Sequence, residues 1–347
     1  MSPLSPFSEA RAYAAATLCE VGGVRLAARF TAPAAEYDAA RSGAALLDRS
    51  DRGLLAVRGR DARAWLHNLV TNAVRTLDEG AGSYAFACNV KGRILFDLNI
   101  LAVGDGLWLD LDRATIPAAT AHFDRHLFTE DVRFADLSGQ TARLGCTGPR
   151  CADLARDLGV AHFAALPALG HVALPDEVRF VRHDCAGGPG FELVVPRGAA
   201  AGWWDRLAAA GATPVGRDTL DVLRIEAGLP WLGRDLDETV LPPETGQVER
   251  GVSYHKGCYL GQEVLERMRA HGALARRLVR LAVDDGRDLA LPATLLQAGA
   301  DVGRVTSLVP HPRDGRWIGL GYVRTSVTGC ADLEVGTPPR AVTVLSG

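Results

Sequence analysis

Residues 83–103, with the sequence SYAFACNVKGRILFDLNILAV, are the stretch that decides the fold class. Two apolar runs flank the turn NVKGR at residues 89–93, and the glycine of this turn suits a hairpin loop. In the second run an apolar residue stands at every second position from Ile94 to Ile100, which predicts a strand. Because helices and hairpins alternate here without a regular βαβ repeat, the pattern favours an α+β fold over a doubly wound sheet.

Further elements extend from this hairpin in both directions. Upstream, the sequence predicts a strand at Leu54–Val57 and a helix that is capped by Asp61 and continues to Leu69. Downstream, it predicts a helix over Ile116–Phe128. Residues 141–210 then show a similar order of strands and helices, which indicates a second α+β unit.

The C-terminal third of the chain has a different character. Residues 228–256 form a long stretch punctuated by Gly and Pro, and such a stretch is functional or disordered. After it come short β-like runs with frequent turns, which indicate a small all-β domain. We therefore expect three domains, with the bounds 1–140, 141–274 and 275–347.

Composition limits the class of protein. The chain has 347 residues, 48% of them hydrophobic, and a net charge of −3, so it can bury a core and offers no global basic surface to nucleic acid. Its seven cysteines include no CxxC pair, which argues against a disulfide framework or a zinc ribbon. No stretch approaches the ~20 apolar residues that cross a bilayer. We expect a soluble, cytoplasmic protein without a membrane partner.

Only two of the 38 basic residues are lysines, Lys91 and Lys256. Lys256 lies in the segment HKGCYLGQE at residues 255–263, two residues before Cys258. A compact cation and the start of a helix both favour the thiolate form of a cysteine. We therefore prefer a reactive Cys258 to the alternative of a small buried residue in a tight turn.

The second lysine, Lys91, lies in the hairpin turn, where exposure alone would explain it. Asp97 follows on the adjoining strand, on the face opposite the apolar residues, so it faces either a ligand cavity or solvent. Glu192, which comes after a glycine-rich loop, and Arg217, at the entry to a helix, are unremarkable in isolation.

Two other patterns have simple explanations. His122 and His126 have the spacing of a zinc-protease motif, but Phe123 replaces its glutamate, so a solvated helix face is the better interpretation. We predict no metal site. The arginines between Arg267 and Arg280 predict a solvated surface, with RNA or an acidic partner as the minority alternative.

The segment LPPETGQVERGVSYHKGCYLGQEVLERM resembles the signature of the YgfZ-type proteins. These are folate-binding relatives of the glycine-cleavage aminomethyltransferase, or T-protein, that act in iron–sulfur cluster assembly or repair. Further similar segments, among them LLDRSDRGLLAVRGRDARAWLHNLVTN, NVKGRILFDL and GFELVVP, extend the resemblance along nearly the whole chain. The resemblance implies a three-domain arrangement around a central channel, with two α+β portions and a C-terminal β-barrel.

The same resemblance implies roles for individual residues. Asp97 falls on the catalytic carboxylate of the aminomethyltransferase, and Glu192 and Arg217 on its folate-pterin and substrate contacts. A carboxylate can pair with the amide and amino edge of a pterin, and Lys91 would approach the negatively charged folate tail. This chain departs from the enzyme at Phe96, which replaces an acid, and at Cys185, which replaces a tyrosine.

These observations lead to a functional expectation. We expect a tetrahydrofolate-binding accessory protein, without turnover of its own, that supports [4Fe–4S] clusters through transient contact with Cys258 and with iron–sulfur carrier or client proteins. One thiolate cannot hold a cluster that ordinarily takes four cysteines. The alternatives are a folate-dependent one-carbon transferase, in which Asp97 steers a folate nitrogen, and a protein associated with tRNA modification.

Overall fold

The computed structural model describes residues 2–272, 274–327 and 332–346. The chain divides into two compact units. The first contains residues 1–68, 72–85 and 98–220, and the second contains residues 69–71, 86–97 and 221–347. Among the residues described, no helix is long and apolar enough to cross a membrane.

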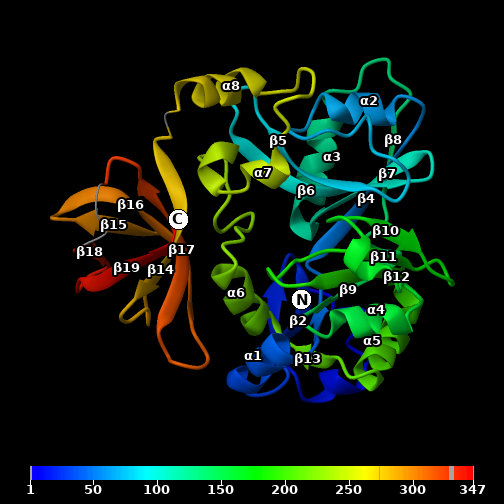
Figure 1. Ribbon diagram of the computed structural model, residues 1–347, viewed down its shortest axis with the longest axis horizontal. Helices are drawn as coiled ribbons and strands as arrows, with labels where there is room; N and C mark the ends of the chain where they lie inside the picture. The colour runs from blue at the N-terminus through cyan, green and yellow to red at the C-terminus, as the bar shows by residue number, and fades with distance from the viewer. Residues whose placement is uncertain (1, 273, 328–331, 347) are drawn as a thin grey trace. The chain divides into compact units, whose positions relative to one another are not determined.

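A six-stranded sheet organises one half of the first unit (Figure 1). Its strand order is β10-β11-β12-β9-β3-β13, and only β13 and β3 pair in parallel. The strands are β3 (Ala45–Asp48), β9 (Thr141–Thr147), β10 (His171–Ala173), β11 (Arg179–Arg182), β12 (Gly190–Pro196) and β13 (Thr213–Val215).

Helices cover this sheet with aromatic and aliphatic side chains. Helices α4 (Cys151–Asp157) and α5 (Ala200–Ala209) both pack against β12, and α5 also packs against β9 and β3. Trp204 of α5 is fully buried, and its ring lies 5.3 Å from that of Phe7. The remaining helices that begin in this unit are α1 (Pro33–Ser42), α2 (Ala62–His67), α3 (Ile116–Asp124) and α6 (Arg217–Glu226), and a separate hairpin is formed by β1 (Thr17–Val21) and β2 (Val24–Arg29).

His171, on the edge strand β10, gives the fold an expected response to acid. It is buried, and burial, followed by the nearby charge of Arg179, lowers its pKa to about 4. The unfolded chain, with a His pKa near ~6.5, therefore takes up a proton before the folded one does. We expect stability to fall as the pH drops from about 6.5 to 4, and His171→Gln to weaken this dependence.

Urea unfolding at several pH values, with His162→Gln as the control because His162 is exposed, checks this expectation. If the free energy of unfolding depends on pH in the same way in the wild type and in His171→Gln, then His171 does not contribute to the acid response.

The second sheet has five strands in the order β5-β6-β7-β4-β8. They are β4 (Arg52–Arg58), β5 (Gly82–Cys88), β6 (Ile94–Val103), β7 (Gly106–Asp112) and β8 (Arg133–Asp136), so the hairpin predicted from residues 83–103 is confirmed as β5 and β6. Residues 86–97, which include its turn, belong to the second unit.

Two predicted helices in this region differ in detail from those observed. Helix α2 ends at His67, and the Asp61 carboxylate accepts a hydrogen bond from Asp131 N (2.9 Å) instead of capping the helix. Helix α3 ends at Asp124, four residues before the predicted Phe128, which is 82% exposed.

The expectation that His122 and His126 form a solvated helix face is wrong for His122. That side chain is buried, and its ring centroid lies 4.7 Å from that of His126. Burial, followed by the charges of His126 and Arg125, lowers the pKa of His122 to about 4.

The C-terminal part of the second unit is a closed barrel, drawn in orange to red in Figure 1. Its strand order is β14-β17-β16-β15-β18-β19, and fully buried aliphatic residues such as Leu281, Leu295 and Val305 fill it. The prediction of a small all-β domain is therefore confirmed. The strands are β14 (Arg276–Val283), β15 (Ala293–Gln297), β16 (Ala300–Pro310), β17 (Trp317–Arg324), β18 (Leu333–Val335) and β19 (Arg340–Ser346).

The segment 228–256, predicted to be irregular, contains only the short helix α7 (Val248–Gly251) and a 3-10 turn at Pro242–Thr245. The longer helix α8 (Gln262–His271) follows it. The observed chain is an α+β protein with a C-terminal β-barrel, as predicted.

Candidate functional site

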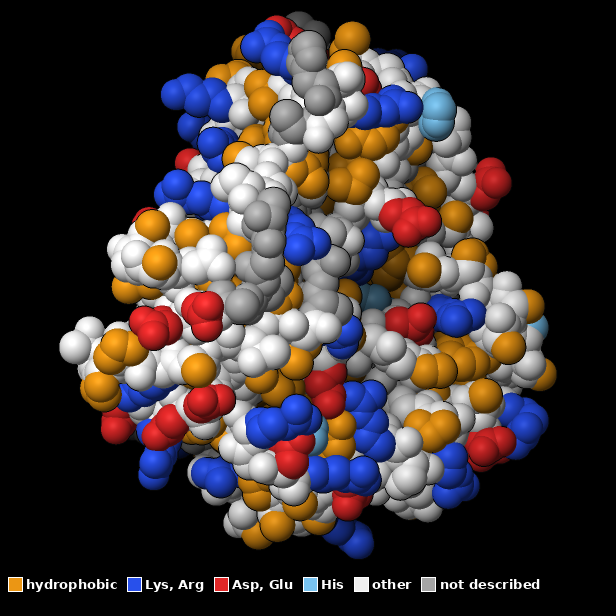
Figure 2. Space-filling model, turned by 60° about the vertical axis from the view of Figure 1, so that its left-hand side comes forward, with side chains coloured by type: hydrophobic (Ala, Val, Ile, Leu, Met, Phe, Trp, Pro, Cys, Tyr) orange, Lys and Arg blue, Asp and Glu red, His pale blue; other side chains and the backbone are white. Residues whose placement is uncertain are grey.

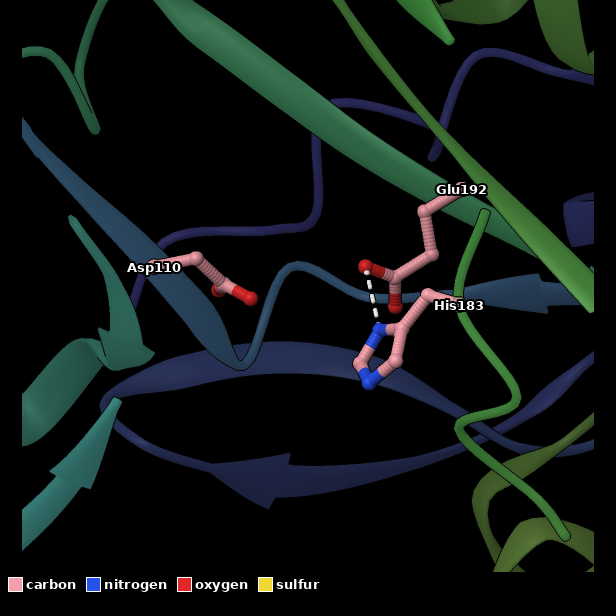
Figure 3. Close-up of side chains that lie close together, drawn as sticks. All are labelled: Asp110, His183 and Glu192. Atoms are coloured by element: carbon pink, nitrogen blue, oxygen red, sulfur yellow. Dashed lines mark ion pairs between the residues drawn. The ribbon is translucent and has the colours of Figure 1, made fainter. Parts of the chain in front are cut away.

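Glu192 lies at the centre of a buried cluster of charged side chains in the first unit. Strand β12 carries it between β11 and β9, and its side chain is fully buried. Its Oε1 accepts a hydrogen bond from Arg49 Nη1 (2.8 Å), and its Oε2 accepts one from Arg143 Nη1 (2.9 Å). His183 Nδ1 lies 3.1 Å from the same Oε2 (Figure 3). Both carboxylate oxygens are therefore already paired with cations or an imidazole.

Asp110, on β7, extends the cluster from the other sheet. Its carboxylate lies 2.6 Å from Arg143 Nη1 and 2.9 Å from Arg52 Nε. Asn99 Nδ2 donates a further hydrogen bond to it at 2.7 Å. Arg143 thus bridges Asp110 and Glu192 and connects the two sheets of the unit.

Arg217 joins the cluster through Asp51. Its Nη1 donates to Asp51 Oδ2 at 2.7 Å, and Asp51 Oδ1 lies 3.5 Å from Arg49 Nε. Arg217 is the first residue of α6, and the buried Glu36 holds the chain at that point. Glu36 Oε2 accepts hydrogen bonds from Gly216 N (2.8 Å) and Thr219 Oγ1 (2.9 Å), so this side chain of α1 anchors the start of the helix that carries Arg217.

The arginines keep the carboxyl groups of the cluster ionised. Burial alone raises the pKa of Glu192, but His183, Arg49 and Arg143 hold that pKa well below its usual range. In the same way, burial alone would raise the pKa of Asp51, but Arg217 and Arg49 lower that pKa by a larger amount. Each group is a charged member of a hydrogen-bonded salt-bridge network.

Asp110, His183 and Glu192 also have ligand atoms within 4.8 Å of one another, a spacing that a metal ion could use (Figure 3). However, the Arg143 guanidinium already contacts both carboxylates at 2.6 and 2.9 Å. A second cation between the same oxygens would be repelled by this arginine. The geometry therefore favours a salt-bridge network over a metal centre.

The predicted pterin contact of Glu192 stays a prediction. Both oxygens are engaged and the side chain is fully buried, so neither oxygen is open to a pterin edge in this structure. Cys185 is also buried, and burial raises the pKa of its thiol to about 12, although Arg49 lowers it.

Asp97 belongs to the second unit, whereas Glu192 and Arg217 belong to the first. It lies on β6 and is only 9% exposed, so of the two alternatives for this residue, exposure to solvent is wrong. Phe96 beside it is buried as well.

The two lysine-containing segments pack together in the second unit. Gly92, in the β5–β6 turn, and Gly261, at the start of α8, both have positive φ angles, of 73° and 85°. A Cβ on Gly261 would lie 2.6 Å from Asn89 O, and one on Gly92 would lie 2.8 Å from Leu265 Cδ1. Glycine suits both positions because their φ angles are positive, and at Gly261 the backbone of the β5–β6 turn also lies too close for a Cβ.

The surroundings of Cys258 differ from those expected. Helix α8 begins at Gln262, four residues after it, and Lys256 Nζ donates to the Val70 carbonyl at 2.6 Å. The same ammonium group lies 4.9 Å from the centre of the Tyr259 ring. Cys258 itself is exposed, unlike the other five described cysteines, and Lys91 is also exposed. The reactive thiol therefore remains a prediction, now supported by its accessibility.

The arginines from Arg267 to Arg280 are largely engaged within the second unit. Arg267 pairs with Glu263 at 2.7 Å, and Arg276 pairs with Glu244 at 3.1 Å. The guanidinium carbon of Arg269 lies 4.4 Å from the centre of the Tyr254 ring. On the face shown in Figure 2, basic side chains lie among acidic and apolar ones. These contacts favour the prediction of a solvated surface over an RNA site.

Sequence reasoning missed most of the charged cluster. The missed residues are Arg49, Asp51, Arg52, Asp110, Arg143 and His183. One signal was available, because the sequence DRSDR at 48–52 places four charged residues directly before a buried strand. Such a density of charge beside a strand is unusual unless the side chains pair with one another.

Comparisons with known proteins agree along the whole chain. Residues 7–256 match the GCVT N-terminal domain, and residues 276–345 match the glycine cleavage T-protein C-terminal barrel domain. The aminomethyltransferase of Rubrobacter xylanophilus is 32% identical over 340 residues, covering 96% of this chain and 91% of the relative. The aminomethyltransferase of Geobacillus kaustophilus is 32% identical over 333 residues, covering 93% of this chain and 91% of the relative.

A solved structure shows the same fold. The glycine cleavage system aminomethyltransferase T from Bartonella henselae superposes with a TM-score of 0.88, covering 99% of this chain and 97% of its own, at 22% identity.

The expectation of a protein without turnover of its own is wrong, because the relatives that match along nearly their whole length are enzymes by name. The two matched domains cover most of the 347 residues in the order seen in the structure. The chain therefore belongs to the glycine cleavage T-protein family.

Proposed function

We propose that the chain is a tetrahydrofolate-dependent one-carbon transferase of the aminomethyltransferase type. The observation that carries this proposal is the match to curated aminomethyltransferases over more than 90% of both chains. Folate is then a substrate of the protein. The carbon of an aminomethyl donor bonds to the folate nitrogens as its bonds to the amine nitrogen and to the rest of the donor break, so ammonia and the remaining donor leave.

Asp97 is the residue to which we assign the chemistry. It is a carboxylate held on a strand, 9% exposed and followed by the buried Leu98, so its position is well defined. A carboxylate in such a position can hydrogen-bond a folate nitrogen and exchange a proton with it during transfer. Because Phe96 replaces the neighbouring acid, this chain would rely on a single carboxylate.

A turnover assay tests the proposal. The purified protein is given tetrahydrofolate with aminomethylated glycine-cleavage intermediates, and methylenetetrahydrofolate is measured. We expect turnover in the wild type and a loss of about a hundredfold for Asp97→Asn. The matched control is Asp105→Asn, since Asp105 is exposed in the β6–β7 turn. Absence of turnover in the wild type, or equal rates for Asp97→Asn and the control, would contradict the proposal.

A second candidate function is supported by the motif at 255–263. We propose that the chain is of the YgfZ type and that it also supports assembly or repair of [4Fe–4S] clusters in client enzymes. The exposure of Cys258 favours this role, because a thiolate must be accessible to meet a cluster on a carrier or client protein. The contact would be transient, since one thiolate supplies only one of the usual four ligands.

Replacing Cys258 with serine in cells checks this second role. We expect the activities of iron–sulfur enzymes to fall, while methylenetetrahydrofolate formation by the purified variant stays at the wild-type rate. Cys19→Ser is the control, because Cys19 is a partly exposed cysteine outside the motif. Unchanged iron–sulfur enzyme activities in the Cys258→Ser cells would leave only the transferase proposal.

A further inference from the structure

A small cavity beside the charged cluster of the first unit is lined by three arginines and three hydroxyl groups. These are Arg52, Arg113, Arg143, Ser50, Ser138 and Thr141. No acidic side chain is among the described residues that line it. Ser50 Oγ already donates to Asp48, and Thr141 Oγ1 donates to the Leu137 carbonyl, so the remaining donors at this surface are the arginines and the Ser138 hydroxyl.

Two of the cavity's arginines share their carboxylate partners, and the third has none among the described residues. Asp110 is shared between Arg52 and Arg143, at 2.9 and 2.6 Å. Glu192, the other partner of Arg143, is shared with Arg49. Arg113 Nη1 donates only to the Ser138 carbonyl, at 3.3 Å, and no carboxylate among the described residues lies within ion-pair distance of it. Arg113 is therefore the arginine at this cavity that has no carboxylate partner among the described residues.

Two donors at the cavity lack an acceptor. Arg143 is 6% exposed, and its buried Nη2 has no hydrogen-bond partner among the described residues. Ser138 Oγ accepts a hydrogen bond from Leu54 N at 3.0 Å, so its own hydrogen is available to donate. Buried donors of this kind call for an acceptor, and a negatively charged one suits arginine best.

The size of the cavity limits what it can hold. Its volume is about 10 Å³, roughly the space of one water-sized particle. A phosphate, a sulfate or a carboxylate-bearing metabolite is too large. We propose that this cavity binds a single monoatomic anion, with chloride as the natural ligand.

Thermal unfolding of the full chain tests the proposal. Tm is measured in sodium chloride and in sodium gluconate at equal ionic strength, because gluconate is too large for the cavity. We expect chloride to raise Tm by about 2–4 °C, since a ligand that binds only the folded state stabilises it. Arg113→Gln is expected to abolish this difference. Arg150→Gln, at a position 62% exposed and outside the cavity, is expected to retain it.

Bromide provides a direct second measurement that needs no variant. Crystals of the wild-type protein grown in bromide should show an anomalous peak within hydrogen-bond distance of Arg143 Nη2 and Ser138 Oγ. A water molecule at that position with no anomalous signal would overturn the proposal. Equal Tm values in chloride and gluconate would overturn it too. Neither measurement depends on the transferase activity.

Discussion

Replacing Arg224 with methionine is expected to lower the free energy of unfolding by about 3–5 kcal/mol. The Arg224 side chain is fully buried in the second unit, and its Nη1 donates to Asp235 Oδ2 at 2.7 Å. Its Nη2 donates to Ser307 Oγ at 2.8 Å, and its guanidinium carbon lies 4.4 Å from the centre of the Trp231 ring. Without this cation the fully buried Asp235 carboxyl group loses its ion-pair partner.

Arg234 provides the matched control for this prediction. Arg234 contacts Asp221, at 2.9 Å, and lies over the same Trp231 ring, but 44% of its side chain is exposed. Arg234→Met should therefore cost under about 1 kcal/mol. Urea unfolding is measured for both arginine variants, for Asp235→Asn and for the double variant that combines Arg224→Met with Asp235→Asn. A double variant that costs the full sum of the two single changes would show that Arg224 and Asp235 are not coupled.

Local patterns in the sequence were sufficient to predict the strand β6 and an all-β C-terminal domain. The alternation from Ile94 to Ile100 identified β6, because a strand with a buried face needs that spacing. The short β-like runs after residue 275 predicted a small all-β domain, and its closure into a barrel was predicted through the resemblance alone. The C-terminal limits of α2 and α3 were less predictable, because tertiary contacts decide where a helix ends.

The charged cluster could not be predicted in the same way. Arg49 and Glu192 are 143 residues apart in the chain, and Arg217 and Asp51 are 166 apart. A single charged residue in a sequence is usually at the surface, and only the folded chain shows which partner allows it to be buried. Glu192 and Arg217 were placed in the predicted site through the resemblance alone. Their partners were not predicted.

The packing of the two lysine-containing loops could not be predicted from the sequence either. The sequence marked Gly92 and Gly261 separately, as turn residues in segments about 170 positions apart. Their close approach depends on β5, β6 and α8 being in place. The sequence predicted Lys256 as a partner for Cys258. In the structure its ammonium group also donates to the Val70 carbonyl, and no local sequence pattern indicates that contact.

Glu192→Gln is expected to destabilise the protein by about 3–5 kcal/mol at neutral pH. The substitution keeps the shape of the side chain and removes the charge that Arg49 and Arg143 share. Arg49 then retains Asp51 at 3.5 Å, and Arg143 retains Asp110 at 2.6 Å, so both arginines stay buried with less negative charge around them. Urea unfolding measures the loss, and Glu249→Gln is the control because Glu249 is exposed.

The pH dependence of this loss separates charge from shape. Burial alone raises the pKa of Glu192, but His183, Arg49 and Arg143 lower it well below its usual range. The stabilisation by the carboxylate is therefore complete above the unfolded-state pKa of ~4.3 and is lost as the pH falls through the folded-state pKa. The gap in unfolding free energy between wild type and Glu192→Gln should persist at and above pH 5. It should then narrow below pH ~4.3, and a gap of the same size at pH 3 would mean that packing, rather than the ion pairs, is what the glutamine disturbs.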